Sequence, residues 1–128
     1  IGVDAIIIPK NRSASLNSDA IKTSVGGAFR VPIIKVNHLK DAIYFLRENG
    51  ILLIAITEKA IQTIYEKDLK YPIALIIGSE DLGISKGILK IIQCKAKLPM
   101  SNRIDSLNVS VACGVVFYEV IRQRNYSN

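Results

Sequence analysis

Four short apolar runs constrain the fold of this chain more than any other feature. They occupy residues 3–9, 31–36, 51–56 and 72–77. None of them alternates regularly between apolar and polar residues, as a strand with one solvated face would, so each is expected to be a strand buried on both faces. Helix-like segments separate the runs. This order is typical of an α/β fold built on a parallel sheet.

The helix boundaries are marked by capping residues. Asn37 is expected to cap a helix that continues through Asn49 on an apolar stripe, with Gly50 as the residue that ends it. Ser85 is expected to cap a shorter helix through Ile92. A fifth, short strand is expected at residues 94–98.

Composition narrows the class of protein. The chain has 128 residues, enough for one folded domain, and no apolar run approaches the roughly 18 residues of a membrane helix. Its two cysteines stand singly in apolar surroundings, as buried thiols of a cytoplasmic protein would. Seventeen Lys and Arg against eleven Asp and Glu give a net charge of +6. This charge slightly favours a polyanionic partner such as RNA.

The last third of the chain joins a polar hinge to a long helix. Residues 101–108 are mostly polar, and the helix expected from about Ser106 to Arg124 is apolar on almost every side, so we expect it to be buried. Either Asp105 or Ser106 can cap it. Asn108 then lies in its first turn, where free N–H groups and the helix dipole attract a carboxylate or phosphate.

Polar loops should meet at one edge of the sheet. In parallel sheets, ligands bind beyond the carboxyl ends of the strands, and the polar loops at 57–58, 78–85 and 99–108 all belong there. Glu80 alone is explained equally well as a solvated acid in a tight turn. Several polar groups converging on one place favour a binding site.

Familiar catalytic motifs are missing from the sequence. We find no Ser-His-Asp set, no zinc-ligand spacing, no Walker loop and no G-x-G-x-x-G. His38 is the one histidine and is expected at the surface, at the start of a helix. Cys113 lies in the middle of an apolar helix and is not expected to be a nucleophile. No metal site is expected.

Three stretches resemble one family. Residues 78–85, GSEDLGIS, are similar to its second motif, and residues 98–124, LPMSNRIDSLNVSVACGVVFYEVIRQR, to its third, in which the run SLNVSVA is especially specific. At these residues the chain resembles the SpoU (TrmH-like) RNA ribose methyltransferases of the SPOUT class. Residues 3–36 resemble the branch that modifies guanosine in rRNA.

The resemblance implies a Rossmann-like α/β domain whose C-terminal helix passes through a loop to form a trefoil knot. The knot would hold S-adenosylmethionine, and two copies would form a homodimer near the last helix. The positions that match the cofactor site are Thr57, Gly78, Leu98, Met100 and Leu107. Those that match the catalytic site are Glu80, Ser106 and Asn108. RNA is expected to contact Lys10, Arg12, Arg30 and Arg103.

The sequence departs from the family pattern in two ways. Asn102 replaces a glycine of the third motif, and Asn tolerates positive φ better than most residues. The first motif, N-x-G-x-x-x-R, is not found, and Arg12 is not the equivalent of its arginine. We therefore expect residues 1–128 to be a catalytic domain without its first strand and helix.

These observations favour a methyltransferase that acts on a ribose 2'-OH, with a guanosine of 23S rRNA as the leading target. A tRNA ribose is the nearest alternative. A catalytically incomplete fragment that binds RNA or S-adenosylmethionine is another. A generic nucleotide-binding domain would have an unknotted sheet and no affinity for the methyl donor.

Overall fold

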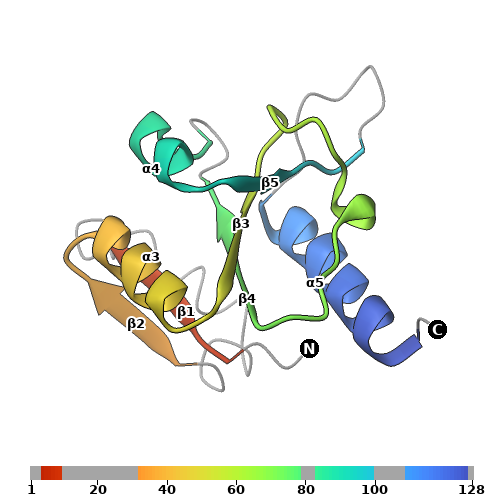
Figure 1. Cartoon of the computed structure of the whole chain (residues 1–128), viewed down its shortest axis with the longest axis horizontal. Helices are drawn as coiled ribbons and strands as arrows, with labels where there is room; N and C mark the ends of the chain where they lie inside the picture. Colours follow the sequence, from red (N-terminus) through yellow and green to blue (C-terminus); the bar gives the residue numbers. More distant parts are fainter. Residues whose placement is uncertain (1–3, 10–31, 79–82, 100–108, 127–128) are drawn as a thin grey trace. The chain divides into compact units, whose positions relative to one another are not determined.

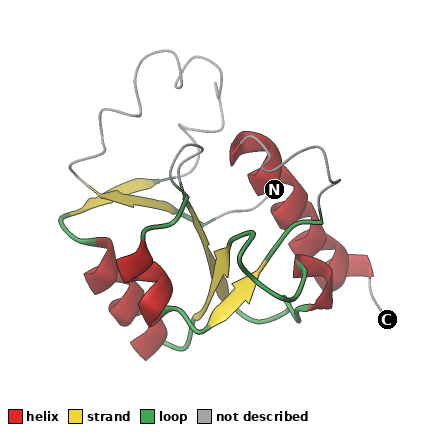
Figure 2. Ribbon diagram, turned by 90° about the horizontal axis from the view of Figure 1, so that it is seen from above, coloured by secondary structure: helices red, strands yellow, loops and turns green. Residues whose placement is uncertain are grey.

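The computed structural model describes residues 4–9, 32–78, 83–99 and 109–126, with side chains from 111 onward in the last range. The chain divides into two compact units, residues 1–45 and 46–128. The elements of each unit can be followed in Figure 1 by their labels and in Figure 2 by their type.

The first unit contains two paired strands. Strand β1 (Ile6–Pro9) and strand β2 (Ile33–Val36) run parallel, and all four residues of each strand are paired. Both correspond to expected apolar runs, although each begins later than the sequence suggested. Residues 10–31, which connect the two strands, lie outside the described residues.

Helix α3 (Leu39–Glu48) follows β2 and spans the boundary between the units. It is amphipathic, with Ile43 buried, as the expected helix at 37–49 required. Gly50 has a φ of +79°, a conformation that favours glycine and ends the helix. His38 lies at the surface just before the helix, as expected, and its carbonyl accepts a hydrogen bond from the Asp41 N–H at 3.2 Å.

A three-stranded parallel sheet forms the frame of the second unit. Strand β3 (Leu52–Ile56) lies between β4 (Ile73–Ile77) and β5 (Cys94–Ala96), as Figure 1 shows. All pairs described in the two sheets are parallel, which confirms the expected α/β class. The parallel arrangement follows from the continuous apolar strands, because such strands need cover on both faces.

Short connections and two helices complete this unit. A 3-10 turn, η2 (Ile64–Glu66), lies between β3 and β4, and helix α4 (Lys86–Ile91) lies between β4 and β5. Ser85 caps α4 as expected, because its hydroxyl accepts a hydrogen bond from the Ile88 N–H at 3.4 Å. Helix α5 (Val109–Tyr126) ends the described chain.

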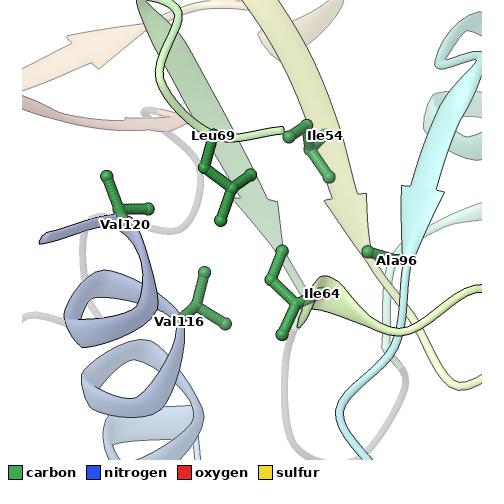
Figure 3. Close-up of a cluster of buried hydrophobic side chains, with 6 residues drawn as sticks. All are labelled: Ile54, Ile64, Leu69, Ala96, Val116 and Val120. Atoms are coloured by element: carbon green, nitrogen blue, oxygen red, sulfur yellow. The ribbon is translucent and has the colours of Figure 1, made fainter. Parts of the chain in front are cut away.

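The core of the second unit joins the sheet to α5. Figure 3 shows side chains from α5 pointing toward η2 and the connection that follows it, beside residues of β3 and β5. The cluster consists of Ile54, Ile64, Leu69, Ala96, Val116 and Val120. Truncating a large member of such a cluster to alanine typically destabilises a protein by about 2–5 kcal/mol.

The expected burial of the final helix on almost every side is wrong for a single chain. Val116 and Val120 pack into the core, whereas Val111 and Tyr118 are 52% and 65% exposed. The reason is geometric. Val111 and Tyr118 lie seven residues apart, on one stripe of the helix, and the sheet and η2 cover only the opposite side.

Candidate functional site

Three strand ends meet at one edge of the sheet in the second unit. Ile56, the last residue of β3, is paired with Ile77 of β4 and with Ala96 of β5. The Thr57 N–H also donates to the Ala96 carbonyl at 2.8 Å. Adjacent strands lie about 4.8 Å apart. The structure therefore brings Thr57 and Gly78, which directly follow β3 and β4, to the same carboxyl edge, and Leu98 lies two residues beyond the end of β5.

Gly78 is required by close backbone packing at this edge. A Cβ atom added to Gly78 would overlap the backbone of Gly83 and Ile84. Gly83 has a φ of +67°, which only glycine adopts at little cost. Gly78 therefore permits a close approach of the chain's own backbone, and Gly83 supplies a positive φ. The residues between them, 79–82, lie outside the described residues.

Thr57 organises the turn that leaves β3. Its hydroxyl oxygen accepts a hydrogen bond from the Lys59 N–H at 3.2 Å, and its carbonyl accepts one from the Ala60 N–H, also at 3.2 Å. The side chain is half-buried. A small polar residue with a satisfied backbone is therefore fixed in place at the edge where a ligand would bind.

Leu98 leaves β5 next to a second backbone connection. The Lys97 N–H donates to the Gln62 carbonyl at 2.9 Å, and the Lys97 carbonyl accepts a hydrogen bond from the Ile64 N–H at 2.8 Å. These bonds attach the exit of β5 to the segment before η2. Leu98 itself is half-buried and packs against the core cluster.

A polar clasp, made by Glu119, Arg122, Gln123 and Arg124, attaches α5 to the segment at residues 67–71. The Gln123 side chain accepts from the Leu69 N–H at 2.7 Å and donates to the Lys67 carbonyl at 2.8 Å. Arg124 donates to the Leu69 carbonyl at 3.2 Å and to the Tyr71 carbonyl at 2.6 Å.

Glu119 completes the clasp from within the core. Its carboxylate is 5% exposed and accepts two hydrogen bonds from Arg122, at 2.7 and 2.9 Å, and one from the Gln123 amide at 2.8 Å. The Arg122 hydrogen bond is the main reason that the pKa of Glu119 lies below its ordinary value, and burial acts in the opposite direction.

The clasp was not anticipated from the sequence. Glu119, Arg122, Gln123 and Arg124 lie in the run YEVIRQR, which contributed to the family resemblance but was given no role. The signal that points to it is local: acidic and amide side chains occur every fourth residue on an otherwise apolar helix face. Polar side chains at core-facing positions need partners.

The remaining site predictions lie outside the described residues. They comprise the catalytic candidates Glu80, Ser106 and Asn108, the cofactor candidates Met100 and Leu107, and the RNA candidates Lys10, Arg12, Arg30 and Arg103. They stay predictions. Of the cofactor candidates, Thr57, Gly78 and Leu98 are described, and these are the ones that meet at the carboxyl edge.

The described part of the chain shows no metal cluster and no reactive thiol. No cluster of three or more potential metal ligands occurs among these residues. Cys94 and Cys113 are free and half-buried, and burial raises the pKa of the Cys113 thiol, which keeps it protonated and unreactive. None of the described helices has the length and apolar character needed to cross a membrane.

Comparison with known proteins identifies the family. Residues 1–118 match the model of the SpoU rRNA Methylase family. The chain belongs to the SpoU rRNA methylase family. It is 37% identical over 123 residues to the 23S rRNA (guanosine-2'-O-)-methyltransferase RlmB of Pseudomonas aeruginosa, covering 96% of this chain and 50% of that protein. The chain thus spans about half the length of the curated relatives that it matches.

Solved structures of SpoU proteins share the fold. An AdoMet-bound rRNA methyltransferase from Sinorhizobium meliloti superimposes with a TM-score of 0.82 at 25% identity, covering 98% of this chain and 48% of that one. The TrmH/SpoU tRNA modifying enzyme of A. aeolicus gives a TM-score of 0.76 at 28% identity, covering 93% and 61%. The recognition of the family from its second and third motifs is confirmed.

Proposed function

We propose that this chain carries the methyl-transfer site of an RNA 2'-O-methyltransferase that takes its methyl group from S-adenosylmethionine, with a guanosine of 23S rRNA as the target. One observation of the structure carries the proposal. Thr57, Gly78 and Leu98, three positions that match the cofactor site of SpoU proteins, follow three different strands whose ends lie at one carboxyl edge. The similarity to a 23S rRNA guanosine methyltransferase supports the choice of target.

The residues at this edge fit the proposed cofactor. Leu98 is an apolar, half-buried residue of the kind that packs against a flat base, Thr57 is small and polar, and Gly78 lets the loop after β4 fold tightly against this edge. S-adenosylmethionine supplies an activated methyl group on its sulfonium. The work left to the protein is to bring that methyl group and the ribose hydroxyl into line and to exclude water.

The catalytic roles fall to residues beyond the described part of the chain. We assign Asn108 and Ser106 to orientation of the group that receives the hydroxyl proton, and Glu80 to fixing the geometry of the loop after β4. Met100 and Leu107 would complete the cofactor pocket. Lys10, Arg12, Arg30 and Arg103 would contact phosphate groups of the RNA.

We also propose that the chain is threaded as a trefoil knot. The support is the position of α5. Gln123 and Arg124 bind the backbone of the connection between η2 and β4, so the end of the chain is bound to a connection that precedes it by more than fifty residues. An experimental structure that traces residues 98–126 tests the threading directly.

The exposed stripe of α5 supports the proposal of a homodimer. Val111 and Tyr118 are more than half exposed on the side of α5 that faces away from the core. Exposed apolar side chains on one face of a helix are a common mark of an interface. A second copy of this chain would cover them.

A radiolabelled transfer assay tests the function. The chain is incubated with donor labelled in the methyl group and with 23S rRNA or tRNA that lacks modifications. A 2'-O-methyl group blocks attack of the 2'-oxygen on the adjacent phosphate, so alkaline hydrolysis should release the label in a dinucleotide. Label in a guanosine-containing dinucleotide from 23S rRNA supports the proposal.

Other outcomes separate the alternatives. Transfer to tRNA alone would assign the chain to the activity named for the A. aeolicus relative. Donor binding in titration calorimetry without transfer to either RNA would identify a binding module. A chain that neither binds the donor nor transfers a methyl group would overturn the proposed function.

A further inference from the structure

A cationic hollow lies beside the carboxyl edge of the second unit. It has a volume of about 550 Å³ and combines residues from three places: the turn after β3, the residue that follows η2, and strand β5 with the residue before it. Its polar lining consists of Lys59, Gln62, Lys67, Gln93 and Lys95. No carboxylate from the described part of the chain lines it, so the three ammonium groups are uncompensated within the hollow.

The hollow is held in shape by hydrogen bonds. Lys67 is fixed at both ends, because its carbonyl accepts from the Gln123 amide at 2.8 Å and its Nζ donates to the Gln62 side chain at 2.6 Å. The Gln62 carbonyl in turn accepts from the Lys97 N–H at 2.9 Å. Lys95 is carried by strand β5, which is paired with β3. Less side-chain freedom is therefore left to lose when a ligand binds.

The position of the hollow relates it to the proposed reaction. Its first lysine, Lys59, is two residues from Thr57, and the Lys59 N–H donates to the Thr57 hydroxyl oxygen at 3.2 Å. A ligand in the hollow would therefore lie next to the edge where the methyl donor is proposed to bind. The predicted RNA contacts at Lys10, Arg12, Arg30 and Arg103 do not include any residue of this hollow.

We propose that this hollow binds the phosphodiester backbone of the RNA substrate. Ammonium groups attract the phosphates, and the glutamine amides add neutral donors for phosphate oxygens. Contacts of this kind position a nucleic acid without reading its sequence. The inference rests on the proposed RNA substrate and adds to it a binding surface on the side of β5.

A pair of matched triple variants tests the surface. In one, Lys59, Lys67 and Lys95 are all changed to Gln. In the other, the same change is made at three exposed lysines elsewhere, Lys40, Lys70 and Lys90. Both lower the net charge equally. A double variant, Lys59→Gln with Lys95→Gln, leaves the Lys67–Gln62 hydrogen bond in place and serves if the triple variant fails to fold.

Affinity for a 23S rRNA transcript is measured by filter binding at several salt concentrations. Because an exposed charge pair changes an affinity by roughly two- to fivefold, the hollow variant should bind about tenfold more weakly than its control. Its plot of log affinity against log salt should be shallower by roughly 2, since each phosphate contact to a single strand contributes about 0.7. Donor affinity in calorimetry should be unchanged, and methyl transfer should recover at saturating RNA.

Two results would overturn the assignment. Equal loss of RNA affinity in both triple variants would reduce the effect to net charge. Loss of donor affinity in the hollow variant alone would place the hollow in the cofactor pocket. Methyl transfer by the unmodified parent chain separates this inference from the proposed function. If the parent transfers the methyl group and both triple variants bind RNA equally well, only the RNA-binding role of the hollow is rejected. If the parent chain transfers no methyl group and only the hollow variant loses RNA affinity, the RNA-binding role of the hollow is supported and the proposed methyl-transfer function is rejected.

Discussion

The side chain of Gln123 binds the backbone N–H of Leu69 across 54 positions of sequence, at a distance of 2.7 Å. Leu69 is fully buried, and Gln123 is 6% exposed. The amide of Gln123 also donates to the Lys67 carbonyl and to Glu119. One side chain therefore joins the terminal helix, the core and the segment that carries a lysine of the cationic hollow.

Replacing Gln123 by Ala should destabilise the chain by about 2–3 kcal/mol. The change leaves the buried Leu69 N–H and the half-buried Lys67 carbonyl without their partner. An unsatisfied buried group costs about 1–3 kcal/mol, part of which local relaxation recovers. Urea denaturation followed by circular dichroism measures the loss. Asn125→Ala, an exposed change on the same helix, is the control and should stay within about 0.5 kcal/mol. Equal stability of the two variants would show that the clasp is not structural.

The clasp also predicts how stability depends on pH. The hydrogen bond from Arg122 lowers the pKa of Glu119 in the folded chain below its ordinary value of 4.5. Between the two pKa values the unfolded chain binds more protons than the folded one, so stability rises with pH across this window. The contribution of Glu119 is complete above about pH 4.5 and is lost as the pH falls through the folded pKa.

Unfolding midpoints measured from pH 3 to pH 7 test this dependence. Glu119→Gln should be less stable than the parent at pH 7 and should show a smaller loss on acidification, because it has no carboxylate to protonate. Parallel profiles for the two proteins would mean that Glu119 does not titrate differently in the folded chain.

Glycines at the carboxyl edge should differ from glycines elsewhere. Gly78→Ala places a methyl group against the Gly83 and Ile84 backbone, so the loop must move, and we expect loss of donor binding with it. Gly83→Ala meets open space and bears only the cost of positive φ, about 1–2 kcal/mol. Gly114→Ala, in α5 with nothing nearby, should stabilise the helix by up to about 1 kcal/mol.

Calorimetric titration with S-adenosylmethionine and thermal melts separate these three effects. The expected order of donor affinity places Gly114→Ala level with the parent and Gly78→Ala lowest. A Gly78→Ala chain that binds the donor as well as the parent would contradict the assignment of this edge to the cofactor.

Local patterns in the sequence were enough to predict most of the described secondary structure. Unalternated apolar runs located β1 to β4, Ser85 marked the start of α4, and Gly50 marked the end of α3. Each of these signals acts over a few residues, because capping and burial of a strand depend on neighbours in sequence. The loops that follow parallel strands could also be placed at a common edge of the sheet.

Long-range packing could not be predicted in the same way. Leu69 stands in a polar segment, KDLKYP, and nothing local indicates that it is fully buried. Its burial depends on packing against α5, which lies about fifty residues later in the sequence. The three lysines of the hollow likewise come from separate segments and gather only when β5 pairs with β3. The exposed stripe of α5 was missed because apolar composition alone does not say which side of a helix the core covers.

That stripe leads to a prediction about assembly. If a second copy covers Val111 and Tyr118, then Tyr118→Glu should convert a dimer into a monomer, because a desolvated carboxylate at an apolar interface is costly. Sedimentation velocity of the parent and the variant at equal concentration measures the change, and circular dichroism checks that the helix persists. Tyr126→Glu, at the exposed end of α5, is the control and should remain dimeric. A parent chain that sediments as a monomer at high micromolar concentration would reject the dimer, and the stripe would then need a different partner.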